Sequence, residues 1–200
     1  MELIWISLGI GYFFGSFLTA AAVAYLCTGK SIREIGSGNP GMANVMSNIG
    51  KKQGALVLGG DILKMILAFL LAWELTGKGD SGQVILWTGF GGVLGHNFPL
   101  WRKFKGGKGV AVTCTWLIIF MPLWGTLSCL VGGVVTLVTG YLPLGAMVIS
   151  ILAVPFAFWQ KGGMAGILML LAALLMFTRH YRGLRRVIQG KEPKKFRKRE

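Results

Sequence analysis

The chain has 200 residues, of which 54% are hydrophobic and 14% are charged, and its mean hydropathy is +0.63. This composition excludes an ordinary soluble domain and indicates an integral membrane protein. The net charge of +14 would suit nucleic acid, but the basic residues lie at the ends of apolar runs and in one tail. Membrane topology and anionic lipid explain that placement, so we expect membrane lipids as partners and no nucleic acid.

Apolar runs follow one another along the chain, and a helix needs roughly 20 residues to cross the hydrocarbon core. The run from Val110 to Val138 exceeds one span and contains Met121-Pro122-Leu123-Trp124-Gly125, which is typical of a tight turn between helices. The sequence therefore predicts an all-α integral membrane protein with seven transmembrane helices in one domain. Their expected bounds are 3–27, 54–75, 84–99, 110–121, 124–138, 142–159 and 162–178, followed by a basic segment over 179–200.

Lysine and arginine are concentrated in the segments that follow the first, third and seventh expected helices. Cytoplasmic loops collect positive charge, so we expect an external N-terminus and a cytoplasmic C-terminus. The same three segments hold most of the polar side chains outside the apolar runs. We therefore expect them to form one site at the cytoplasmic face.

The first segment is rich in glycine and asparagine and reads Gly36-Ser37-Gly38-Asn39-Pro40-Gly41, with Asn44 shortly after. It matches the letters of a dinucleotide-binding GxGxxG loop, but a membrane helix rather than a β-strand precedes it. Glycines can turn successive N–H groups into one concavity that binds an anion. An anion site and a plain surface turn are both compatible with this loop.

The second segment places lysines and glycines directly before an expected helix, as Lys105-Gly106-Gly107-Lys108-Gly109. Amide donors, a helix N-terminus and two cations together favour a phosphate site. His96 lies near the end of the preceding apolar helix. It is either a hydrogen-bonded core histidine or a group that accepts a hydroxyl proton or fixes a loop.

The third segment begins at Arg179 and His180 and includes Arg182. A basic amphipathic cap on the membrane surface and a contribution to the site are both compatible with it. Inside the second expected helix, Asp61 and Lys64 are three residues apart and so share a face. We interpret them as a structural brace, with Lys64 also able to approach the anionic site.

Together the three segments resemble the motifs of the PlsY family of bacterial membrane acyltransferases, over nearly the whole chain. The first is similar to GSGNxGATN, the second to GHxxPxFxxFKGGKGVAT, and the third, more weakly, to RHxxNIxRLxxGxE. The resemblance implies transfer of a fatty acyl group from acyl phosphate to the sn-1 hydroxyl of glycerol 3-phosphate. The products are lysophosphatidic acid and phosphate, in the first step of phospholipid synthesis.

The resemblance further implies a multi-pass protein of the bacterial inner membrane, with no metal or organic cofactor. Association with an enzyme that produces acyl phosphate is a possible partnership. It implies catalytic roles for Ser37, His96 and His180. The expected substrate-binding residues are Gly36, Gly38, Asn39, Gly41, Asn44, Lys105, Gly106, Gly107, Lys108, Gly109, Arg179 and Arg182.

Two departures from the family pattern bear on the acceptor. Ser47 stands where the family has arginine, and Gly183 stands where it has asparagine. Arginine binds phosphate in a bidentate manner that serine cannot imitate. The alternative hypothesis is therefore a non-catalytic or altered-acceptor member that binds acyl phosphate or lipid, and Arg182 is a candidate replacement cation. The proton acceptor stays open among His96, His180 and a substrate phosphate oxygen.

Overall fold

The computed structural model describes residues 1–194, and over that range every regular element is a helix. This confirms the prediction of an all-α protein. The chain divides into two compact units, Met1–Trp116 and the part from Leu117 onward. The expected tail over residues 195–200 lies outside the described residues.

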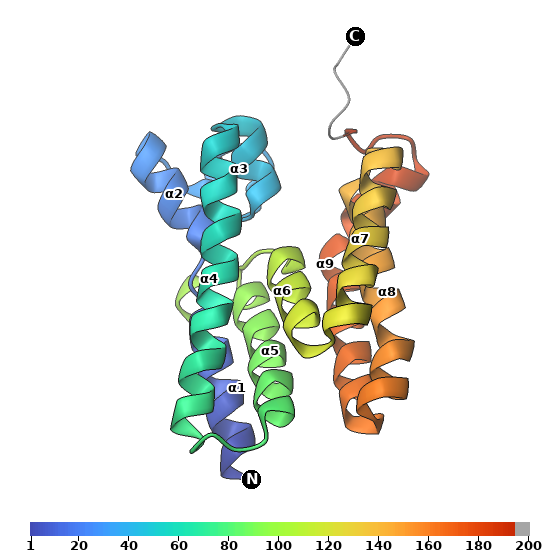
Figure 1. The fold of residues 1–200 in the computed structure, drawn as a ribbon. Helices are drawn as coiled ribbons and strands as arrows, with labels where there is room; N and C mark the ends of the chain where they lie inside the picture. The colour runs from blue at the N-terminus through green and yellow to red at the C-terminus, as the bar shows by residue number, and fades with distance from the viewer. Residues whose placement is uncertain (195–200) are drawn as a thin grey trace. The chain divides into compact units, whose positions relative to one another are not determined.

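The first unit is built around three long helices, α1, α4 and α5, which run side by side (Figure 1). Shorter elements complete it, and α6 begins in it. The bounds are α1 Glu2–Gly15, α2 Thr19–Thr28, α3 Met42–Asn48, α4 Lys51–Leu75, α5 Ser81–Asn97 and α6 Val110–Phe120, with 3-10 turns η1 at Ile32–Glu34 and η2 at Leu100–Arg102.

Glycines bring α1 and α5 into direct backbone contact. A methyl group built on Gly11 would collide with the carbonyl of Thr88, and one on Gly15 would collide with the backbone of Gly92. Small residues allow this approach in a membrane, where helix association depends on close packing rather than on hydrophobic burial. The contact fixes the end of α5, which carries His96, against α1.

The first expected helix, 3–27, is broken in the structure. Helix α1 ends at Gly15 and α2 starts at Thr19, with Ser16, Phe17 and Leu18 between them. The hydroxyl of Ser16 donates a hydrogen bond to the carbonyl of Phe13 at 2.6 Å. A break leaves carbonyl groups without helical partners, and inside a bilayer they must find donors elsewhere.

The second unit consists of α7 Pro122–Thr139, α8 Leu142–Lys161 and α9 Gly163–Ile188, together with the last turn of α6. Trp124 stacks on Phe156 with ring centroids 4.2 Å apart and joins α7 to α8. Helix α9 continues ten residues past the expected end at 178. The third motif is therefore helical up to Ile188.

Five helical segments of the described chain are long and apolar enough to cross a membrane: Glu2–Thr28, Lys51–Leu75, Pro122–Thr139, Leu142–Lys161 and Gly163–Ile188. Helix α5, with 17 residues, and α6, with 11, are shorter than these. A multi-pass membrane protein is thus supported, while seven spans and their orientation stay predictions. The turn at Met121 and Pro122 occurs where the sequence predicts it.

Candidate active site

The loop of the first motif is organised by the side chain of Asn44 on α3. Its carboxamide oxygen accepts from the Ser37 amide at 3.0 Å, and its nitrogen donates to the Ile35 carbonyl at 2.9 Å. Gly36 and Gly38 have φ values of 54° and 68°, which favour glycine. The predicted importance of Asn44 is therefore explained first by loop structure, because this buried side chain closes the turn.

The loop amides differ from the expected anion nest, because most of them donate within the loop itself. The Gly38 amide donates to the Ile35 carbonyl at 2.9 Å, and that of Asn39 to the Ser37 hydroxyl at 3.4 Å. The Gly41 amide donates to the Asn39 carbonyl, and Gly41 is the N-cap of α3. What the loop presents to a ligand is chiefly the exposed side chain of Ser37.

The second motif folds back onto the end of α5. The Gly106 amide donates to the Asn97 carbonyl at 3.1 Å, and the Gly107 amide donates to the His96 carbonyl at 2.9 Å. A methyl group on Gly107 would collide with Nε2 of His96 and would lie 3.0 Å from the Pro40 carbonyl oxygen. The first and second motifs therefore meet at Gly107, within one unit.

Cations and a helix end lie beside this junction. Helix α6 has its first backbone bond from the Thr113 amide to the Gly109 carbonyl, at 2.8 Å. The amides of its first turn thus point out of the helix toward the preceding segment. Lys105 is exposed and Lys108 half-buried in that segment. An anion site at this helix start stays a prediction.

Arg33, in η1, is a residue that the sequence reasoning did not select. Its guanidinium donates to the carbonyl of Lys105 and so ties the start of the first motif to the second. Nothing in the local sequence distinguishes it from Lys30 or other topology-determining charges. The contact joins residues 72 positions apart, and only the fold brings them together.

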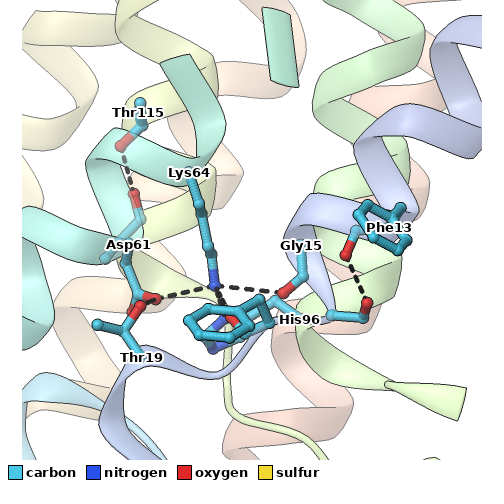
Figure 2. A network of polar contacts seen from close by, with 10 residues as sticks. Phe13, Gly15, Thr19, Asp61, Lys64, His96 and Thr115 are labelled. Carbon is cyan, nitrogen blue, oxygen red and sulfur yellow. Dashed lines mark hydrogen bonds and ion pairs between the residues drawn. The ribbon is translucent and has the colours of Figure 1, made fainter. Parts of the chain in front are cut away.

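A buried polar network centred on Lys64 includes His96, whose ring contacts Gly107 (Figure 2). Nζ of Lys64 is 2.8 Å from Oδ1 of Asp61, and Thr19 donates to that same oxygen at 3.0 Å. Lys64 also donates to the carbonyls of Gly15 and Phe17, at 3.2 and 2.8 Å. The predicted ion pair forms, and its lysine supplies the donors that the break between α1 and α2 requires.

The fourth neighbour of Lys64 is His96. Nζ and Nδ1 are 3.0 Å apart, and both side chains are almost fully buried. Lys64 therefore approaches the site through His96, on the side of the ring opposite Gly107. The ring is held from both sides, because Gly107 packs against its Nε2.

The third motif lies on α9 in the second unit. His180 is fully buried, with Nδ1 3.0 Å from the carbonyl of Met176. Arg179 is half-buried and Arg182 is exposed. Gly183 packs so closely on Pro143 that an added methyl group would lie 2.7 Å from its Cγ. The expected asparagine is thus replaced by a glycine that this packing requires.

A family model described as "Glycerol-3-phosphate acyltransferase" matches residues 5–190. Glycerol-3-phosphate acyltransferase 1 of Lactobacillus johnsonii is 37% identical over 86% of this chain and 82% of its own length. The Bacillus subtilis glycerol-3-phosphate acyltransferase is 34% identical over 92% of this chain and 94% of its own length.

Solved structures are similar over the same range. A crystal structure of the integral membrane glycerol 3-phosphate acyltransferase PlsY, in its glycerol 3-phosphate form, has a TM-score of 0.84 and 30% identity, covering 97% of this chain and 96% of that one. Its lysophosphatidic acid form has a TM-score of 0.81 and 29% identity, covering 97% and 95%.

Proposed function

Because this chain belongs to the glycerol-3-phosphate acyltransferase family, we propose that it transfers a fatty acyl group from acyl phosphate to the sn-1 hydroxyl of glycerol 3-phosphate. The products are lysophosphatidic acid and inorganic phosphate, and the reaction is the first step of phospholipid synthesis. The place of action is the bacterial inner membrane. The observation that carries the proposal is the meeting of the two glycine-rich motifs at Gly107, beside the N-terminus of α6.

The chemistry needs placement more than activation. Acyl phosphate is a mixed anhydride with a good leaving group, so the acceptor hydroxyl attacks the acyl carbon directly and no acyl-serine forms. The C–O bond to phosphate breaks, and the hydroxyl proton passes to a base. Lys105, Lys108 and the first amides of α6 neutralise charge on phosphate oxygens as it develops. Ser37 contributes a hydroxyl donor from the neighbouring loop.

The residues of the third motif enter the proposal as acceptor-side groups. Arg179 and Arg182 supply cations and His180 a hydrogen-bonding ring, in keeping with the family resemblance. Acyl phosphate is hydrolysed readily, so direct delivery by the enzyme that produces it would protect it. The non-catalytic alternative is not favoured, because named acyltransferases match nearly the whole chain.

The test uses purified protein in lipid nanodiscs, supplied with acyl phosphate with and without glycerol 3-phosphate. Phosphate release and lipid product are followed together. We expect lysophosphatidic acid only with acceptor, and we expect a Ser37→Ala, Lys108→Ala variant to lose it. Losing a charge-assisted contact alone lowers affinity about tenfold to a hundredfold. Equal phosphate release without acceptor, or faster turnover with neutral glycerol, would reject glycerol 3-phosphate as the acceptor.

A further inference from the structure

The buried network in Figure 2 determines what His96 can do in the reaction. Three acceptors other than the histidine surround Nζ of Lys64: Oδ1 of Asp61 and the carbonyls of Gly15 and Phe17. Each of them requires an N–H donor, since none of them carries a hydrogen. Three N–H donors make Nζ an ammonium, which has no lone pair and cannot accept a hydrogen bond.

Nδ1 of His96 lies 3.0 Å from this ammonium. The four neighbours share its three hydrogens, and because the ammonium has no lone pair, Nδ1 can interact with it favourably only as an acceptor. A protonated Nδ1 would face a cation with a hydrogen, and an imidazolium would add a second positive charge at the same distance. The ring is thus neutral, with its proton on Nε2. That nitrogen faces Gly107, where the two glycine-rich motifs meet.

The second histidine has the opposite arrangement. Nδ1 of His180 lies 3.0 Å from the Met176 carbonyl, which can only accept, so Nδ1 carries the proton. The lone pair of that ring is on Nε2. The two histidines of the chain therefore present opposite tautomers, and only His180 has a basic nitrogen at Nε2.

We propose that Lys64 is a positioning residue that fixes His96 in its Nε2–H tautomer, so that His96 donates a hydrogen bond at the junction of the two motifs and does not serve as the general base. The inference rests on the proposed acyl transfer. It leaves His180 or a substrate phosphate oxygen as the proton acceptor. The hydrogen bond from Nε2 would stabilise a substrate oxygen that gains charge during transfer.

The tautomer is measured first, by NMR of the whole protein labelled with ¹³C,¹⁵N-histidine in lipid nanodiscs. A purification tag without histidine leaves only the chain's 2 histidines in the spectrum. One-bond correlations to ring carbons identify the protonated nitrogen, and a His180→Phe variant assigns the signals. We expect the proton of His96 on Nε2. A proton on Nδ1 of His96 would overturn the proposal.

Two replacements of His96 then separate a donor from a base. A glutamine amide reaches the position of Nε2 and an asparagine amide that of Nδ1, while neither takes up a proton. We expect His96→Gln to stay within about tenfold of the wild-type kcat, and His96→Asn to fall about a hundredfold, as for loss of one oxyanion donor. Equal, complete losses in both variants would show that His96 is the base.

A third variant tests Lys64 itself. We expect Lys64→Met to release the ring, so that His96 shows both tautomers, and to lower kcat more than it raises KM. An unchanged single tautomer in folded Lys64→Met protein would show that the lysine does not fix the ring. If the wild-type protein forms no lysophosphatidic acid, the proposed function fails, and the NMR spectrum still decides the tautomer.

Discussion

Replacing Asp61 by asparagine preserves the shape of the side chain and removes one charge of the buried pair. Asp61 and Lys64 are 2.8 Å apart, with side chains 3% and 6% exposed. Breaking a buried pair on one side destabilises a protein by about 3 to 5 kcal/mol, because the remaining charge is uncompensated. We expect a loss of that size for Asp61→Asn.

Lys64→Met is expected to be more damaging, since it also removes the donor to the carbonyls of Gly15 and Phe17. Each carbonyl left unsatisfied costs about 1 to 3 kcal/mol. The double variant Asp61→Asn, Lys64→Met has no buried charge but retains both orphaned carbonyls. Its free energy of unfolding should therefore be about 2 to 6 kcal/mol lower than that of the wild type. This loss should be smaller than the sum of the losses in the two single variants.

The free energy of unfolding would be measured by reversible denaturant titration in mixed micelles, followed by circular dichroism. The four proteins form a double-mutant cycle, which isolates the coupling of the two side chains. A change below about 1 kcal/mol in Asp61→Asn would refute the argument, because substitutions at unimportant positions lie in that range. Full recovery in the double variant would show that the carbonyls do not depend on Lys64.

Two further predictions concern the junction of the motifs. Gly107→Ala should lower kcat/KM about a hundredfold, because the added methyl group displaces the His96 ring, whereas Gly59→Ala, with open space around it, should behave as wild type in the same turnover assay. Arg33→Ala should raise KM for glycerol 3-phosphate about tenfold, because it releases the Lys105 carbonyl. Arg102→Ala, on the exposed turn η2, should leave this KM unchanged. Equal effects of the two arginine variants would indicate a general loss of positive charge.

Much of the fold could be predicted because hydropathy and turn residues mark it directly. The turn at Pro122 and the starts of α6 and α8 lie where proline, glycine and apolar periodicity place them. The break at residues 16–18 could not be predicted, because hydropathy is continuous across it. The hydrogen-bond donor that stabilises the break is on another helix, so the local sequence does not indicate the break.

The candidate site likewise has some features that the sequence predicts and others that it does not. The composition of the second motif predicts cations and glycines before a helix, and the structure places them there. The hydrogen-bond partners of individual amides could not be predicted. In the first loop these amides donate to carbonyls of the loop and to the side chain of Asn44. The extension of α9 to Ile188 was also not predicted, because charge density suggested a surface segment. Gly183 within this extension packs closely on Pro143, a contact that only the fold brings about.

The break between α1 and α2 has a consequence for the order of assembly in the cell. The carbonyl groups at the break accept hydrogen bonds from Lys64, which is synthesised some 47 residues after Phe17. Until α4 has entered the membrane, residues 2–28 satisfy their backbone groups best as one uninterrupted helix. The broken form of the first segment therefore has its lysine donor only once α4 lies beside it.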